Sequence, residues 1–138
     1  PFLWGSKRTG PDLMRVGNYR STDWHDYHMK DPVSVVPGSI MPKYTWLYEN
    51  IADVETAYAE QITIKRFFDV PYNQPIPMRD GSTETVKLAG TLAGAQASAL
   101  EEAKLVAADM KDQDVKDLVK AGKIPEIVAL IAYMNSLK

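Results

Sequence analysis

The apolar positions of the chain recur with helical spacing in several segments, most clearly near its C-terminal end. There, four apolar residues stand at positions i, i+1, i+4 and i+7, which places them on one face of a helix. These residues are Ile127, Val128, Ile131 and Met134. Pro125 precedes them, and proline fits the first turn of a helix because the N–H that it lacks has no helical partner there. We therefore predict an amphipathic helix after Pro125 whose apolar face packs against another element.

Three other segments show helical spacing that is shorter or less regular. Residues 85–110 are rich in alanine, with larger apolar residues at steps of three and four. Residues 53–68 carry apolar positions with imperfect periodicity, and residues 114–121 read as a short helix that ends at Gly122. The sequence offers no convincing pair of strands and no internal repeat. The pattern predicts an all-α fold.

The N-terminal third of the chain is punctuated by glycine and proline. Residues 1–20 are predicted to form a loop. Ser21 can cap a short helix that runs to about Met29, and Pro32 ends it because the residue before a proline disfavours helical backbone. Residues 31–43 then form a predicted loop with many apolar side chains. Such a loop is expected to be covered by protein or to contact a ligand.

Composition and charge narrow the function classes. The chain has 138 residues, 45% of them hydrophobic and 25% charged, which suits one domain with a modest core. The formal net charge is -2 and the charges are mixed along the chain, so we expect no nucleic-acid partner. No apolar run approaches the roughly 18 residues that span a bilayer. The chain starts at Pro1 without a signal-peptide pattern, so we expect a soluble fragment of a longer protein.

The chain contains no cysteine. Disulfides, thiolate metal sites and the thioether attachment of haem are therefore excluded within these residues. The sequence also shows no serine or cysteine nucleophile signature and no glycine-rich phosphate loop. Two features could still bind a metal or a cofactor, namely a pair of histidines and one methionine in an apolar loop.

His25 and His28 are the only two histidines of the chain. On a helix they lie at i and i+3, so they share a face and could bind a metal. Two histidines do not close a ligand set, however. We therefore favour a structural interpretation, in which this helix has a polar face and Trp24 and Tyr27 pack inward.

Met41 lies in an apolar loop that is bracketed by Pro37 and Pro42. The prolines restrict the loop and could aim the thioether sulfur at a fixed point. A thioether is a soft, neutral ligand that, opposite a histidine, raises the potential of the haem in cytochromes c. Taken alone, a methionine in such a loop is more often a packing residue.

Several blocks of the sequence, in order, resemble one family. The ten-residue block 4–13 resembles the mono-haem cytochrome c subunit (subunit II) of cbb3-type cytochrome c oxidases. The likeness continues through residues 24–32, 35–37, 41–47, 68–72 and 126–134, whereas residues 73–120 add little. Residues 10–13 and 130–133 also resemble class I cytochromes c in general, namely the turn after the haem-attachment motif and the closing helix.

The resemblance implies a partial cytochrome c-like domain that spans residues 1–138. Residues 1–49 would form the distal haem-pocket loops and a short helix, and residues 50–72 a second helix. Residues 73–84 would be a connector, and residues 85–138 the C-terminal helices. Met41 would be the distal axial ligand of the haem iron in the intact parent. Pro11 would support the proximal histidine, and Arg8 would pair with a haem propionate. The pocket lining would consist of Tyr44, Trp46 and Leu47.

The chain departs from the family in one respect. The family carries a C-x-x-C-H motif and a transmembrane anchor upstream of this point, and the chain has neither. We therefore expect an N-terminally truncated domain that lacks the first cytochrome helix, with haem c in the intact parent and none in this fragment. Without that helix, the apolar face of residues 127–134 is expected to be exposed and to drive self-association.

Three functions remain open at this stage. The resemblance implies an electron-transfer subunit that passes electrons through a c-type haem to the catalytic subunit of the oxidase, without catalysis of its own. Its partners would be the catalytic and other cytochrome subunits, and the parent would be anchored in the bacterial inner membrane with this domain in the periplasm. The second interpretation is a helical interaction or assembly module without redox activity. The third is a small metalloprotein that uses His25 and His28.

Overall fold

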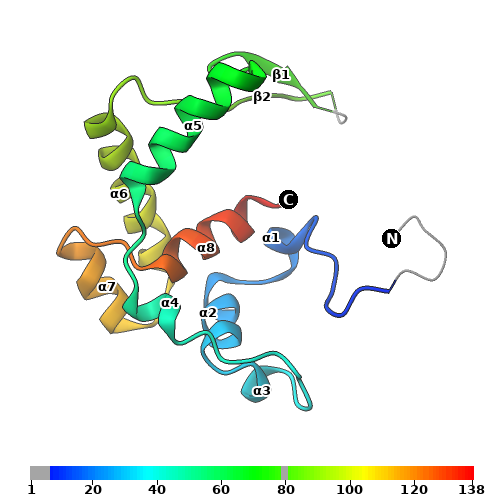
Figure 1. Cartoon of the computed structure of the whole chain (residues 1–138). Coiled ribbons are helices and arrows are strands. Elements are labelled where there is room, and N and C mark those ends of the chain that lie inside the picture. The colour runs from blue at the N-terminus through cyan, green and yellow to red at the C-terminus, as the bar shows by residue number, and fades with distance from the viewer. Residues whose placement is uncertain (1–6, 79–80) are drawn as a thin grey trace. The chain divides into compact units, whose positions relative to one another are not determined.

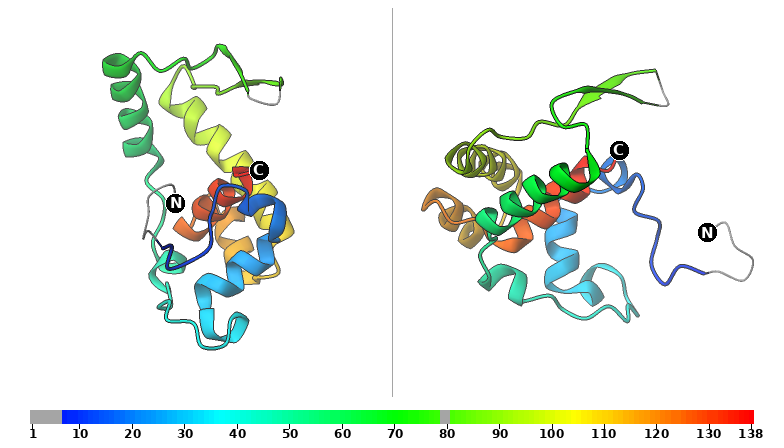
Figure 2. Two further views of the ribbon diagram at one scale, coloured as in Figure 1. Left: turned by 90° about the vertical axis from the view of Figure 1, so that its right-hand side faces the viewer. Right: turned by 45° about the horizontal axis from the view of Figure 1, so that its top comes forward.

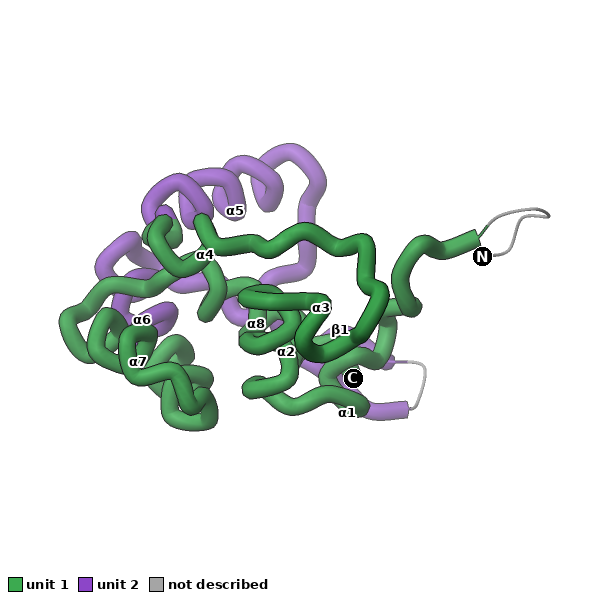
Figure 3. Tube along the Cα trace, turned by 90° about the horizontal axis from the view of Figure 1, so that it is seen from below, with its two compact units in different colours: residues 1–52, 102–138 green, residues 53–101 purple. Residues whose placement is uncertain are grey.

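A computed structural model describes residues 7–78 and 81–138. The chain divides into two compact units, shown in different colours in Figure 3. The first unit joins Pro1–Ala52 to Glu102–Lys138, and the second is Asp53–Glu101. The two units are described separately below. The prediction that residues 1–138 form a single domain stays a prediction.

In the first unit, all the regular elements that the structure describes are helices. These elements are α1 (Val16–Tyr19), α2 (Thr22–Lys30), α3 (Pro32–Val35), α4 (Trp46–Glu49), α6 (Leu92–Asp109), α7 (Gln113–Lys120) and α8 (Glu126–Ser136). The core of this unit is made by the second half of the long helix α6 and by the two C-terminal helices α7 and α8 (Figure 1). The short helices α1, α3 and α4 and the nine-residue helix α2 pack around this core. The predicted all-α class is confirmed.

The apolar stripe of α8 is the centre of this core. Ile127, Val128 and Ile131 are fully buried, and Met134 is nearly so. Helices α1, α2 and α4 all contact α8, and Figures 1 and 2 show α1 and α2 (blue) beside it (red). Our expectation of an exposed face was therefore wrong, because N-terminal helices of the same chain cover it. This face is therefore not available for the self-association that we expected.

Two close contacts bring the N-terminal segments onto α8. The N–H of Gly17 in α1 donates to the carbonyl of Leu137 over 2.8 Å. Backbone pairing beside Ile51 and Pro125 joins the segment after α4 to the start of α8, where the N–H of Ala52 donates to Ile124 over 2.8 Å. These contacts join parts of the chain that are more than 70 residues apart in sequence, so local patterns could not predict them.

Local capping explains where the predicted helices begin and end. The Ser21 hydroxyl accepts a hydrogen bond from the N–H of Trp24, which satisfies a free donor in the first turn of α2. Gly122 follows α7 with a φ of +83°, a left-handed conformation that glycine adopts at little cost. Part of the predicted loop 31–43 is also helical, because Pro32 starts the single turn α3.

The second unit contains α5 (Val54–Phe68), a short hairpin of β1 (Pro75–Pro77) and β2 (Thr83–Thr85), and the first part of α6. The strands are antiparallel, with Ile76 opposite Glu84. The prediction of a helix from residue 85 was wrong at its start. The amide of Asn73 fixes the chain after β2, because its oxygen accepts from the N–H of Leu88 over 3.0 Å, and α6 begins only at Leu92.

Among its described residues, the second unit has no buried side chain. Asp53 caps α5 by accepting from the N–H of Thr56, and this helix, which the sequence predicted over residues 53–68, has no buried residue. In the part of the chain that the structure describes, no helix is both long enough and apolar enough to cross a membrane.

Candidate functional site

Met41 lies in the loop between α3 and α4, within the first unit. Its side chain is partly buried, while the neighbouring Ile40 is 86% exposed. The N–H of Met41 donates to the Ser39 hydroxyl over 3.2 Å. Gly38 turns the loop with a φ of +79°, which favours glycine. The loop therefore holds the methionine in a defined local conformation.

Three contacts tie the C-terminal part of this loop to α2. The N–H of Tyr44 donates to the carbonyl of Met29 over 3.0 Å. The ammonium of Lys43 lies 3.3 Å from the carboxylate of Asp31, which directly follows α2. The phenol of Tyr48, in the helix that follows the loop, bonds to Asp26. The C-terminal part of the loop that carries Met41 is thus held against α2.

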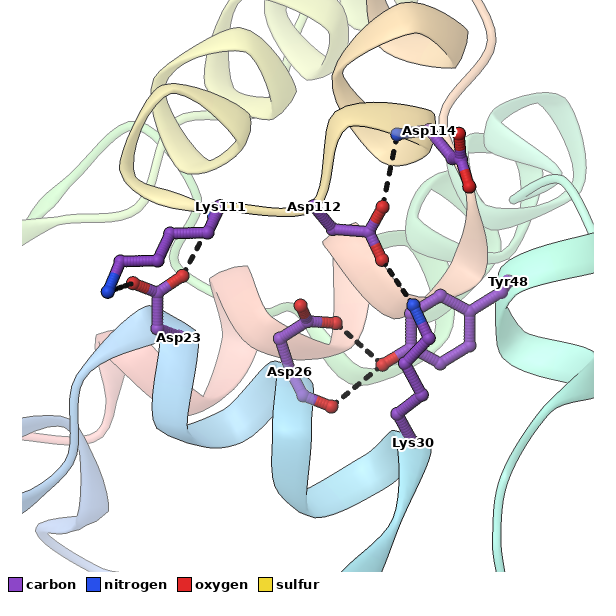
Figure 4. A network of polar contacts seen from close by, with 7 residues as sticks. All are labelled: Asp23, Asp26, Lys30, Tyr48, Lys111, Asp112 and Asp114. Carbon is purple, nitrogen blue, oxygen red and sulfur yellow. Dashed lines mark hydrogen bonds and ion pairs between the residues drawn. The ribbon is translucent and has the colours of Figure 1, made fainter.

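Asp26 and Tyr48 form the buried part of this connection (Figure 4). The phenol oxygen of Tyr48 lies 2.7 Å from the Asp26 carboxylate Oδ1 and 2.8 Å from the Asp26 backbone carbonyl. The phenol proton is shared between these two acceptors. Asp26 is only 2% exposed, so this contact is shielded from water.

A second ion pair closes the network from the side of α7. The Lys30 ammonium donates to the Asp112 carboxylate over 2.6 Å and lies 5.2 Å from the centre of the Tyr48 ring. Asp112 is also the N-cap of α7, where its other oxygen accepts from the N–H of Asp114. Figure 4 shows Lys30 and Tyr48 between α2 and the start of α7.

Burial and the neighbouring charges shift the pKa values in this network. Burial raises the pKa of Asp26 above its usual range, although the hydrogen bond from Tyr48 opposes the shift. Burial, and then the hydrogen bond to Asp26, raises the pKa of the Tyr48 phenol. The hydrogen bond to Asp112 raises the pKa of Lys30. Burial alone would raise the pKa of Asp112, but the hydrogen bond and charge of Lys30 outweigh it and lower that pKa.

The charged face of α2 is visible in the sequence, although the sequence analysis did not identify it as a site. Asp23, Asp26 and Lys30 stand at i, i+3 and i+7, which puts three charged residues on one helix face. In the structure, Asp23 accepts from the N–H of Lys111 over 2.8 Å, next to the Lys30–Asp112 pair. The partners of this face are more than 20 residues away in sequence, so the pattern alone could not name them.

The histidines lie on α2 in an arrangement that differs from the expected one. His25 is 1% exposed and buried with Asp26, whereas Tyr27 is 48% exposed. The expectation that the aromatic residues of this helix pack inward was therefore wrong for Tyr27. The inward stripe consists instead of Thr22, His25 and Asp26 at i, i+3 and i+4.

Both histidines contact Trp24. The His28 ring stacks on the indole with centroids 4.5 Å apart, and the His25 ring meets it edge-on at 5.4 Å. The Nε2 of His25 and the Nδ1 of His28 are buried without a hydrogen-bond partner. Burial is the main cause that lowers the pKa of each ring, which favours the neutral imidazole. Among the described residues no group of three or more histidines and acidic residues could hold a metal, so the metalloprotein hypothesis gains no support.

The remaining predicted site residues fall into two groups. Tyr44 and Trp46 lie together at the end of the Met41 loop, with ring centroids 5.0 Å apart, and Leu47 next to them is partly buried. Arg8 and Pro11 lie in the exposed N-terminal segment, which extends away from α1 in Figure 1. There the Arg8 guanidinium pairs with Asp12 at 3.3 Å. The structure thus gathers Met41, Tyr44, Trp46 and Leu47 in one region and leaves Arg8 and Pro11 apart from them.

The residues around Met41 fit the distal side of a haem. They offer a soft sulfur donor on an anchored loop, together with exposed apolar and aromatic side chains such as Ile40 and Trp46 that a flat apolar group could cover. They do not supply the opposite side. Both histidines of the chain belong to α2, where packing and stacking hold them.

Comparison with known proteins identifies the family. The whole chain, residues 1–138, matches the family described as cytochrome C oxidase, mono-heme subunit/FixO. No curated protein matches the chain. This match agrees with the resemblance seen in the sequence blocks. The chain therefore belongs to the family of mono-haem subunits of cytochrome c oxidase.

Proposed function

We propose that this chain supplies the distal, methionine-bearing side of a c-type haem pocket in a cbb3-type oxidase, through which electrons pass to the catalytic subunit. The observation that carries the proposal is the Met41 loop, whose C-terminal part is tied to α2 by Tyr44, Lys43 and Tyr48. A ligand on such a loop is held in place before the metal arrives. Family membership supports the same role in electron transfer.

When bound, the haem would supply the chemistry, which is the uptake and release of one electron. The Met41 sulfur would bind the iron on the distal side and help to set its potential. Tyr44, Trp46 and Leu47 would exclude water from that side. Pro11 would hold the proximal histidine, and Arg8 would exchange Asp12 for a haem propionate.

The haem itself would be attached through residues outside this sequence. Thioether attachment needs cysteine, and the 138 residues contain none. We therefore propose that these residues alone are haem-free and do not catalyse a reaction. In the intact subunit the domain would lie on the periplasmic side of a bacterial inner membrane, against the catalytic and other cytochrome subunits.

Replacing Met41 tests this function directly. In the intact haem-loaded subunit, Met41→Ala should abolish the absorbance band of methionine-to-iron ligation and lower the haem potential, because a neutral thioether favours the reduced iron. Met78→Ala is the matched control, since Met78 is a partly exposed methionine of the second unit. An unchanged spectrum in Met41→Ala would reject the assignment.

A second candidate function is protein docking through the second unit. Phe67 and Phe68 at the end of α5 are 75% and 78% exposed, and no described residue of that unit is buried. Large exposed aromatic side chains are typical of interfaces. The sequence suggested association through the apolar face of α8, but that face is buried. The exposed side chains of α5 are the surface that supports an interaction module instead.

A further inference from the structure

The three ties between the Met41 loop and α2 differ in how firmly they can hold. The Lys43–Asp31 pair is exposed on both sides, and exposed ion pairs contribute little. The Tyr44–Met29 bond is a single backbone hydrogen bond. The Tyr48–Asp26 contact is shielded from water, because the Asp26 carboxylate is buried.

The surroundings of Tyr48 strengthen the third tie. Its ring lies under the Lys30 ammonium, which is itself held by Asp112 at the start of α7. Moving the phenol away from Asp26 would also take the ring away from the Lys30 ammonium. Removing the hydroxyl would leave a buried carboxylate oxygen without its donor, which is the costly way to lose a hydrogen bond.

We propose that Tyr48 and Asp26 are positioning residues for Met41, which keep the thioether at the iron by fixing the C-terminal end of its loop on α2. The inference rests on the proposed function, because it assumes that Met41 is the distal ligand. Neither residue touches the haem in this proposal. They act by lowering the fraction of time in which the loop is displaced and the sulfur is away from the iron.

This role predicts how an added ligand competes with Met41. Imidazole can bind the ferric iron only when the sulfur has left, so its apparent affinity scales with the displaced fraction. In the intact haem-loaded subunit, Tyr48→Phe should raise the imidazole affinity by about 5- to 30-fold, which corresponds to the loss of one buried hydrogen bond. The measurement is an absorbance titration of the ferric subunit with imidazole.

Tyr58→Phe is the matched control. The Tyr58 phenol donates to the carbonyl of Ala89 over 2.9 Å, is also partly buried, and lies in the second unit. The same atom is removed, but the Met41 loop is not involved, so imidazole affinity should equal that of the wild type. Met41→Ala, which has no sulfur to displace, gives the upper limit of the affinity.

The outcomes separate the two proposals. If Met41→Ala binds imidazole no better than the wild type, the proposed function fails. If Met41→Ala binds more tightly but Tyr48→Phe resembles Tyr58→Phe, the positioning role is overturned and the function stands.

Variants of Asp26 provide a second test of the positioning role. They are needed if Tyr48→Phe does not fold. Asp26→Asn keeps a side-chain oxygen that accepts from Tyr48, whereas Asp26→Ala removes the side-chain acceptor and leaves only the backbone carbonyl. Higher imidazole affinity in Asp26→Ala than in Asp26→Asn supports the positioning role. Equal affinities in these two variants would count against it.

Discussion

At the scale of single residues, Asp26 stands out because it is the one acidic residue that is buried among the residues the structure describes. It is a carboxylate at 2% exposure whose nearest partner is a neutral phenol, because the neighbouring cation, Lys30, is engaged by Asp112. A buried carboxylate without a direct ion pair disfavours its charged form. The raised pKa of Asp26 follows from this arrangement.

The raised pKa makes a prediction about stability and pH. Between the ordinary Asp pKa and the raised one, the folded protein keeps a proton that the unfolded chain has lost, so this contribution to stability is present in acid and is lost as pH rises. Asp26→Asn cannot titrate but still accepts from Tyr48. Its free energy of unfolding should therefore improve relative to the wild type as pH rises from about 4 to 7.

Urea unfolding of both proteins at a series of pH values measures this difference. The result of interest is the change in the gap between the two curves, since the substitution also has a pH-independent effect. Two stability curves that stay parallel over this range would show that Asp26 titrates normally.

At the scale of helices and strands, the sequence predicted helix ends correctly where the contacts that set these ends are local. The Ser21 cap, the Asp53 cap and the glycine after α7 each act within a few residues, and the helices that they bound were predicted within a few residues of their ends. Only the start of the helix predicted over residues 85–110 was wrong, because α6 begins at Leu92. There, pairing of β1 with β2 outweighed the helical tendency of the sequence that leads into α6.

The contact between α1 and the end of α8 leads to a prediction at this scale. A Cβ at Gly17 would lie 2.6 Å from the backbone oxygen of Asn135. Gly17→Ala should therefore force the two elements apart and lower the free energy of unfolding by about 1–3 kcal/mol. Thermal or urea unfolding measures the loss.

Gly10→Ala is the control for this substitution, because a Cβ at Gly10 meets no atom within 4 Å. It adds the same methyl group in the same unit, so its stability should stay close to that of the wild type. Equal stabilities of Gly17→Ala and Gly10→Ala would contradict the close packing of α1 on α8.

At the scale of the whole molecule, the two units differ in what holds them together. The first unit has a core of buried residues on α6, α7 and α8, whereas no described side chain of the second unit is buried. Burial of apolar surface is the main source of folding free energy. The second unit therefore gains little from its own packing, and its apolar side chains are available to a partner.

This difference predicts a role for α5 in assembly. Phe67→Ser together with Phe68→Ser should reduce the amount of subunit recovered with the purified oxidase complex, because the pair would lose apolar contact area. The haem spectrum should not change, since these residues lie outside the unit that holds Met41. Quantification of the subunit against the catalytic subunit measures the effect.

Leu105→Ser is the control for surface polarity, because Leu105 is also largely exposed but belongs to the first unit. Normal recovery of the double variant with the complex would exclude α5 as a docking surface. A loss that equals that of Leu105→Ser would point to a general effect of surface substitution.

The sequence by itself determined the family, the all-α class and several of the helix ends, and the resemblance to the family made Met41 the candidate ligand. The helix ends depend on caps and helical spacing between residues that are close together in the chain. The family and the role of Met41 were inferred from ordered blocks of sequence that resemble the family. Only the tertiary structure decided what covers the stripe of α8 and which residues hold the Met41 loop. Asp26 meets Tyr48, and Lys30 meets Asp112, across long stretches of sequence. Such pairs form only once the chain has packed, because the alternation of apolar and polar residues specifies which face is buried but not which element buries it.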